Sequence, residues 1–223
     1  MNAEDMKLDY FHIYLIRALD AGQAVGLQGQ FDRRMGNAKL AFLEWFANPA
    51  SKNREHTFDK NAHLTGYRLQ TTDEPMRVVA FENQFGRQRI VIGSGTHLLA
   101  PARKRELWSE RLDHYKVYKV LPAEKPLDKT VELKDQFGAS KVIVTCPYGF
   151  AVPVKKKYEG TFPIYNDEAH LTLYAIRPAR GDKPMEFAMR PIRVKDQFGT
   201  RGIGRFRSLL LAVPSIKREW KEI

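Results

Sequence analysis

Asp135-Gln136-Phe137-Gly138 is the stretch that decides the fold, because related tetrapeptides recur three more times along the chain. Asn83-Gln84-Phe85-Gly86 and Asp196-Gln197-Phe198-Gly199 are close copies, and Gly29-Gln30-Phe31-Asp32 is a degenerate one. A tyrosine in an apolar-alternating run precedes each copy, and a proline with a lysine three residues later follows it. The tyrosines are Tyr14, Tyr67, Tyr118 and Tyr174, the prolines Pro49, Pro101, Pro153 and Pro214, and the lysines Lys52, Lys104, Lys156 and Lys217. Self-similarity at a period of about 50 residues predicts tandem structural repeats, here four.

The residues around the turn favour a β-hairpin. Thr130–Lys134 leads into it and Ser140–Thr145 leads out, and both runs are rich in β-branched residues. Asp or Asn at the first turn position accepts a hydrogen bond from the backbone two residues on, and the glycine supplies a positive φ. We expect the phenylalanine to pack on its own or a neighbouring unit, and the proline to stand at a strand end or edge. The predicted structural turn residues are Asn83, Phe85, Gly86, Asp135, Phe137, Gly138, Asp196, Phe198 and Gly199.

The repeats predict an all-β fold with units at about 9–53, 61–105, 112–157 and 168–217. We expect them to pair into two pseudo-symmetric small barrels or sandwiches, in residues 1–107 and 108–223. Residues 103–111 have a helical composition and are expected to bridge the halves. A four-bladed, propeller-like ring is the alternative, because four units with up to four strands each also satisfy that arrangement.

Composition indicates a globular chain without a membrane-spanning segment. The 223 residues are 43% hydrophobic, and no apolar run approaches the ~20 residues that a membrane helix needs. The acidic N-terminus has no apolar signal core, which predicts a cytoplasmic protein if Met1 is the natural start and allows a secreted one otherwise. With Cys146 as the single cysteine, neither an intramolecular disulfide nor a cysteine-based metal site is expected. His63, His114 and His170 occupy equivalent positions in different units, so we interpret them as packed residues and predict no metal or cofactor.

The net charge of +11 is concentrated in the second half of the chain. Residues 1–110 hold 15 basic and 13 acidic side chains, whereas residues 111–223 hold 22 and 13. The candidate polyanion-binding residues are Lys155, Lys156, Lys157, Arg201, Arg205 and Arg207. A solvated basic edge that blocks unwanted strand pairing is the alternative interpretation, and we favour it.

The most aromatic stretch is Leu40–Phe46, in the first repeat. Phe42, Trp45 and Phe46 either cover the end of the core or form a self-association surface. The core is the better interpretation, because large exposed apolar patches are uncommon on monomers.

The units resemble an uncharacterised bacterial repeat, a domain of unknown function found in tandem in secreted proteins. The resemblance rests on Asp113–Val120, on Val131–Gly138 with its DQFG turn, and on Gly149–Lys156 with its VPxxK ending. It covers three repeats well and the first weakly, and it implies no activity. Members of that family often carry a cysteine just before the tyrosine and another two residues before the proline, which implies a disulfide within each unit. This chain has Gly66, Val117 and Leu173, and Leu99, Ala151 and Ala212 at those places, as expected for a version in a reducing compartment.

Catalysis needs differing groups that converge, whereas the notable polar residues here recur with the unit. Asn83 in place of Asp135 or Asp196 indicates that the turn needs an acceptor and not a proton carrier. We therefore expect no enzyme but a non-catalytic structural or protein-interaction repeat protein, acting as a subunit of a larger assembly, with itself or another protein as partner and no membrane. Nucleic-acid or polyanion binding through the basic C-terminal half is the alternative, and an enzyme with an unrecognised site is the third reading.

Overall fold

The computed structural model describes residues 6–70, 72–104, 112–122, 126–182 and 186–223, without the side chains of 186–190. Thirteen strands run through these residues, every strand pairing is antiparallel, and the all-β prediction is confirmed. The strands are β1 (Tyr10–Asp20), β2 (Ala24–Gly29), β3 (Gly36–Lys52), β4 (His63–Gln70), β5 (Arg77–Asn83), β6 (Gly86–Ala102), β7 (His114–Val120), β8 (Lys129–Asp135), β9 (Gly138–Lys157), β10 (Thr161–Phe162), β11 (His170–Pro178), β12 (Glu186–Asp196) and β13 (Gly199–Glu222).

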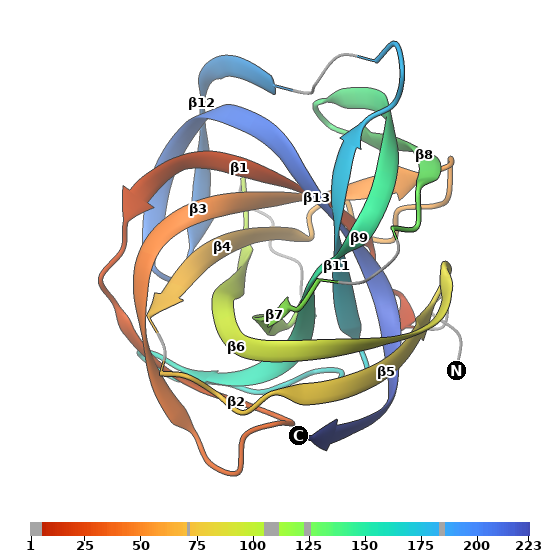
Figure 1. Cartoon of the computed structure of the whole chain (residues 1–223). Coiled ribbons are helices and arrows are strands. Elements are labelled where there is room, and N and C mark those ends of the chain that lie inside the picture. Colours follow the sequence, from red (N-terminus) through yellow and green to blue (C-terminus); the bar gives the residue numbers. More distant parts are fainter. Residues whose placement is uncertain (1–5, 71, 105–111, 123–125, 183–185) are drawn as a thin grey trace.

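Each repeat contributes three strands, and the first and third strands of all four repeats form one closed ring (Figure 1). Within a repeat the pairs are β1–β3, β4–β6, β7–β9 and β11–β13. Between repeats the pairs are β3–β4, β6–β7, β9–β11 and β13–β1. The four-repeat organisation is thus present, but the units share one ring and do not separate into two barrels or into blades. Residues 105–111, expected as a helical bridge, lie outside the described residues.

The middle strand of each repeat forms the predicted hairpin and then docks on a distant unit. β2, β5, β8 and β12 each pair with the first half of the following strand. On their other side, β2 pairs with β9, β5 with β13 and β8 with β3, while β12 bridges to the end of β6 at Lys195 and Arg103. On its outer side, each hairpin therefore pairs with the repeat two positions away and not with an adjacent unit. The third strands, 17 to 24 residues long, carry the hairpins over that distance.

The repeated proline marks the point where the third strand leaves the ring. Pro101 is opposite Leu64 of its own repeat, but the ladder to the next repeat has already ended at Leu99. The other three prolines have the same surroundings. A proline has no N–H to donate, so it fits a position that is locally an edge. Immediately beyond the proline, the third strand pairs with the hairpin of the repeat two positions away.

Alternating side chains divide the core into an inner and an outer layer. All eight ring strands contribute to the inner cluster, which includes Val117, Ala151 and Leu173. The repeated tyrosines, one residue farther along, pack instead in outer clusters with the hairpins. The positions where the resembling family carries cysteines are directly opposed across neighbouring strands: Gly66 and Leu99, Val117 and Ala151, Leu173 and Ala212. That geometry suits a disulfide within each unit.

Candidate functional site

The turns adopt the predicted conformation, because their first side chain accepts the expected backbone hydrogen bond. The N–H of Phe137 donates to Oδ1 of Asp135 at 2.8 Å, and the same bond forms at 2.8 Å in the fourth repeat and at 2.9 Å in the second. The glycines Gly86, Gly138 and Gly199 have φ values of 101°, 139° and 129°. The first residue of the turn is thus committed to holding the backbone.

The second atom of that side chain binds the tyrosine of the repeat two positions away. Tyr14 donates its hydroxyl to Oδ2 of Asp135 at 2.8 Å, and Tyr67 donates to Asp196 at 2.6 Å. In the second turn the direction is reversed, since the amide of Asn83 donates to the Tyr174 hydroxyl at 2.9 Å. The turn phenylalanine lies edge-on against the same tyrosine in all four cases, with ring centroids 4.9–5.4 Å apart. These contacts form a repeated socket of turn, tyrosine and phenylalanine.

The degenerate first turn breaks this socket. Gly29 stands where the other copies have Asp or Asn, and the buried hydroxyl of Tyr118 has no hydrogen-bond partner among the described residues. Phe31 still packs on Tyr118, at 5.3 Å between ring centroids. The aromatic contact therefore persists where the hydrogen bond is lost.

In three of the four repeats, the repeated lysine lies over the phenylalanine of the following turn: Lys104 over Phe137, Lys156 over Phe198 and Lys217 over Phe31. Lys156 is fully buried, and its ammonium lies 4.9 Å from the ring centroid of Phe198 and 4.2 Å from that of Phe162. No hydrogen-bond partner for its Nζ is found in the described part of the chain. Burial lowers the pKa of Lys156 to about 7, although the nearby charges of Asp196 and Glu159 act against the shift. Such a lysine interacts with aromatic faces and does not reach solvent.

A chain of hydrogen bonds that the sequence did not predict joins Ser208, His12, Tyr14 and Asp135. The Ser208 hydroxyl lies 2.8 Å from Nε2 of His12, and Nδ1 of His12 lies 2.9 Å from the Tyr14 hydroxyl. Because the Tyr14 hydroxyl donates to the carboxylate, it accepts from Nδ1 of His12. A serine-histidine-acid unit has a similar order, but here the Tyr14 hydroxyl stands between the histidine and the carboxylate.

The second repeat makes an equivalent connection without a histidine. His12 stands two residues before its tyrosine, and Thr65 holds the equivalent place in the second repeat. Thr65 donates to Asp196 at 2.7 Å, so a threonine makes the same connection to a turn without any base. His12 is the residue that could have indicated this network from the sequence, because Thr65 and Thr172 stand at the equivalent positions. Ser208 could not be linked to it, because it lies 196 residues away.

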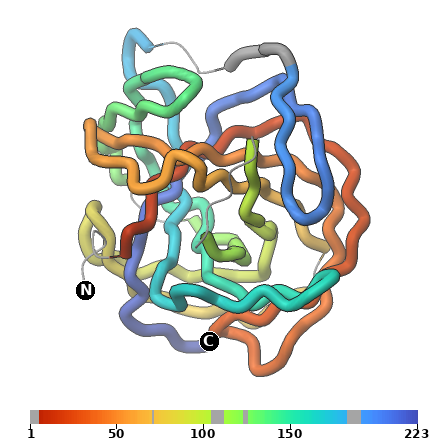
Figure 2. Tube along the Cα trace, turned by 180° about the vertical axis from the view of Figure 1, so that it is seen from behind, coloured from red at the N-terminus to blue at the C-terminus, as the bar shows by residue number. Residues whose placement is uncertain are grey.

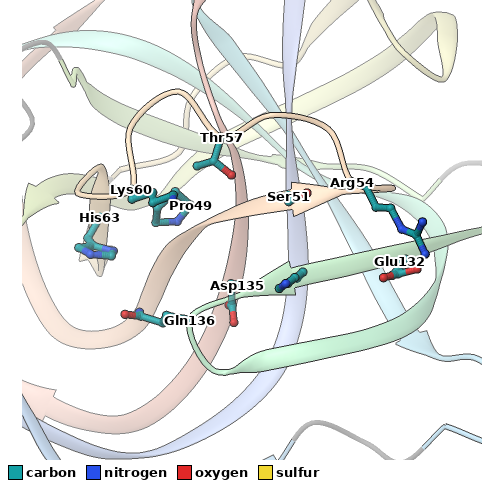
Figure 3. A pocket seen from close by; sticks show the side chains of 10 residues that line it. Pro49, Ser51, Arg54, Thr57, Lys60, His63, Glu132, Asp135 and Gln136 are labelled. Carbon is teal, nitrogen blue, oxygen red and sulfur yellow. The ribbon is translucent and has the colours of Figure 1, made fainter.

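A cavity of about 500 Å³ opens beside the third turn, between the end of β3 and the segment 53–60 (Figure 3). Its cationic lining residues are Arg54, Lys60 and Lys134, its carboxylates are Glu132 and Asp135, and its remaining lining residues are Pro49, Ser51, Thr57, His63 and Gln136. Figure 2 shows the segment 53–60 (orange) beside the β8–β9 hairpin (green), where Asn53 and Glu132 exchange hydrogen bonds at 2.8 and 2.9 Å.

The cavity lies within the size range of small-molecule sites. His63 is buried, and its Nδ1 has no partner within the described ranges. Burial, with a contribution from the charge of Lys104, lowers the pKa of His63 to about 3, so the ring is neutral at physiological pH.

The predicted basic residues divide into exposed and buried groups. Lys155, Lys157, Arg205 and Arg207 are exposed. Lys156 is buried in its aromatic cage and is removed from any contact surface, because the strand alternation points it inward.

Arg201, on β13, is half-buried, and its guanidinium donates to the carbonyl of Thr200 at 3.3 Å. Two further basic residues, both on β12, belong to the exposed group. Arg193 and Lys195, which the sequence analysis did not single out, are exposed on either side of the buried Val194. This alternation was the signal that could have identified them.

The aromatic stretch of the first repeat lies mostly in the core. Trp45 and Phe46 are 2% and 0% exposed, and only Phe42, at 41%, reaches the surface. Trp45 stacks on His97 at 3.5 Å between ring centroids and fills the space above Gly66. A self-association surface made of all three side chains is therefore not formed, because period two turns Trp45 and Phe42 to different environments.

No group of three or more His, Cys, Asp or Glu side chains placed to bind a metal ion occurs among the described residues. The same residues include no helix with the length and hydropathy of a membrane span. The histidines at equivalent repeat positions, His63, His114 and His170, are all buried.

The ring and its sockets define a tandem-repeat protein of the all-β class. Residues 63–214, more than half of the chain, match the family described as "Repeat of unknown function (DUF7450)", and the chain belongs to that family. No curated protein and no solved structure matches it.

Proposed function

We propose that the protein is a non-catalytic binding module that holds an anionic polymer on the exposed face of the β12–β13 hairpin. The observation that carries the proposal is the set of exposed side chains Arg193, Lys195, Arg205 and Arg207, none of which forms an ion pair with a described carboxylate. Basic side chains that are not engaged in ion pairs bind phosphates or sulfates with release of counterions, which supplies most of the affinity for such polymers.

The end of β9 extends this basic surface. Lys156 contacts the ring of Phe198 in the turn between β12 and β13, which places the flanking exposed residues Lys155 and Lys157 beside that hairpin. Residues 155–157 thus lie beside the turn of the hairpin that carries the second basic stretch. This proximity, with 22 basic against 13 acidic residues in the half, supports polymer binding over a solvated edge.

The non-catalytic part of the proposal rests on how the turn residues are used. Both oxygens of Asp135 and of Asp196 accept hydrogen bonds from the fold itself. Side chains so committed hold the hairpins in place and are not free to exchange protons with a substrate.

Fluorescence anisotropy with a labelled DNA duplex, and in parallel with labelled heparin, tests polymer binding at several salt concentrations. The double variant Arg205→Ala with Arg207→Ala is compared with Lys129→Ala and Lys141→Ala, which remove the same charge from exposed positions of the β8–β9 hairpin. We expect the first pair to reduce the slope of log K against log salt by about 1.8 on DNA, since each phosphate contact contributes about 0.9.

The control pair should leave that slope unchanged. Tighter binding of DNA than of heparin would assign nucleic acid as the polymer, and the reverse order would assign an acidic polysaccharide. Failure of the wild-type protein to bind either polymer at 0.05 M salt, or equal losses in both double variants, would refute the proposal.

A further inference from the structure

Two of the four junctions between repeats are closed by the same hydrogen bond. The glutamine of a turn reaches the histidine that begins a neighbouring repeat: Gln197 bonds to His114 at 2.7 Å, and Gln30 bonds to His170. The corresponding pair at the third turn is Gln136 and His63. There the side-chain amide of Gln136 donates instead to Asn48.

Asn48 explains why this junction differs. The residue just before the repeated proline is Ala100, Val152 or Val213 in the other units, and none of these has a polar side chain. Asn48 is fully buried, its side-chain oxygen accepts from Gln136, and its amide donates to Asp135 at 3.3 Å. The glutamine is thereby held away from His63, whose Nδ1 stays without a partner in the described chain, and both side chains line the 500 Å³ cavity (Figure 3).

The chemistry of the lining specifies the ligand. The neutral ring of His63 donates to the main chain of Ala47, so Nδ1 is an acceptor that requires an O–H or N–H from a ligand. Arg54, Lys60 and Lys134 form no ion pair with the described carboxylates, whereas both oxygens of Asp135 are already occupied. The lining therefore offers cations for an anionic group and a buried acceptor for a hydroxyl.

The segment that carries Arg54 is fixed in position. Asn53 and Arg54 have φ values of 49° and 67°, in the left-handed region that is costly for residues other than glycine. The two hydrogen bonds between Asn53 and Glu132 clamp this segment onto β8. A preorganised cation at the rim lowers the entropic cost of binding.

We propose that this cavity binds a small hydroxyl-bearing anion of the sugar-phosphate class, with the anionic group on Arg54, Lys60 and Lys134 and a hydroxyl donating to His63. The site is separate from the basic hairpin, and either assignment can fail without the other.

Isothermal titration calorimetry with glucose 6-phosphate tests the site, with glucose and inorganic phosphate as probes that each lack one half of the ligand. We expect glucose 6-phosphate to bind at least tenfold more tightly than either. Arg54→Ala and Lys60→Ala change exposed side chains and should each weaken binding about tenfold. Lys129→Ala, on the same strand β8 as Lys134 but outside the cavity lining, should leave binding unchanged.

Asn48→Ala supplies a second test that mimics Ala100 of the next repeat. It should free Gln136 from Asn48, let its side-chain amide donate to the unpartnered Nδ1 of His63 and abolish binding in a folded protein. Absence of glucose 6-phosphate binding to the wild-type protein, equally tight binding of inorganic phosphate, or an unchanged affinity in Arg54→Ala and Lys60→Ala would overturn the proposal.

Discussion

Phenylalanine in place of each of the four equivalent tyrosines separates the hydrogen bond of the socket from its packing. The substitution removes one hydroxyl and leaves the ring against the turn phenylalanine, so the four variants differ mainly in what the hydroxyl was bound to. Tyr14 and Tyr67 donate to buried carboxylates, Tyr174 accepts from the amides of Asn83 and Gln88, and Tyr118 has no partner in the described chain.

The expected losses follow these partners. Tyr67→Phe and Tyr14→Phe each lose a hydrogen bond to a charged group, which costs about 1.5–3 kcal/mol of the free energy of unfolding. Tyr174→Phe loses bonds to neutral amides, at about 0.5–1.5 kcal/mol. Tyr118→Phe removes a buried hydroxyl that gains nothing from the fold, so we expect no loss and a gain of up to about 1 kcal/mol.

Urea unfolding followed by circular dichroism measures these differences, and thermal melts provide a check because 1 kcal/mol corresponds to about 2–4 °C in a chain of this size. Wild-type protein and the Tyr118→Phe variant are the matched references, since they share all socket hydrogen bonds. A loss in Tyr118→Phe as large as that in Tyr67→Phe would refute the reasoning, because it would show that the ring environment and not the hydroxyl sets the cost.

Three further predictions concern titration and strand register. Although burial acts in the opposite direction, hydrogen bonding and charge from His12 hold the pKa of Asp135 below its ordinary 3.8. The stability that this carboxylate contributes is therefore present at neutral pH and is lost as the pH falls through the lowered pKa. Asp135→Asn should flatten the acid side of a stability–pH curve, and an unchanged curve would contradict this. Burial lowers the pKa of Lys156 from 10.5 to about 7, so the unfolded chain binds more protons than the folded one between these two pH values. In that pH range the free energy of unfolding of the wild-type protein should rise with pH relative to that of Lys156→Met. Parallel curves for the two proteins would count against a buried amine at this position. Val117→Cys with Ala151→Cys should oxidise to a disulfide that adds about 2–4 kcal/mol, as thiol titration and unfolding will show; the control Val117→Cys with Val152→Cys should keep its thiols, and closure of the control instead would disprove the register.

The local parts of the fold could be predicted because their causes lie within a few residues. An Asp or Asn that caps the turn backbone and a glycine with positive φ decide the hairpin without help from the rest of the chain. Asp135 and Gly138 behave as their residue types require. The repeat spacing likewise predicted four units of three to four strands, of which the structure has three in each.

The closure of the ring could not be predicted, because it depends on which strands meet over long sequence separations. The pairing of β1 with β13, and the docking of each hairpin two repeats away, leave no mark in the spacing of the turns. Trp45 shows the same limit for a side chain: its burial above Gly66 depends on the partner strand and not on its own neighbours.

Comparison of the four repeats shows which residues depart from the common pattern and are therefore candidates for a role in binding. Where a unit keeps the consensus, its polar groups satisfy one another, as Asp196, Tyr67 and Thr65 do. Asn48 departs from three apolar equivalents and has a consequence that packing does not need, since it diverts Gln136 and leaves His63 at an open cavity. An alanine there would lose the bonds of Asn48 to Asp135 and Gln136, so Asn48→Ala must be compared in both stability and ligand binding: a loss of binding without a comparable loss of stability would assign the asparagine to the cavity.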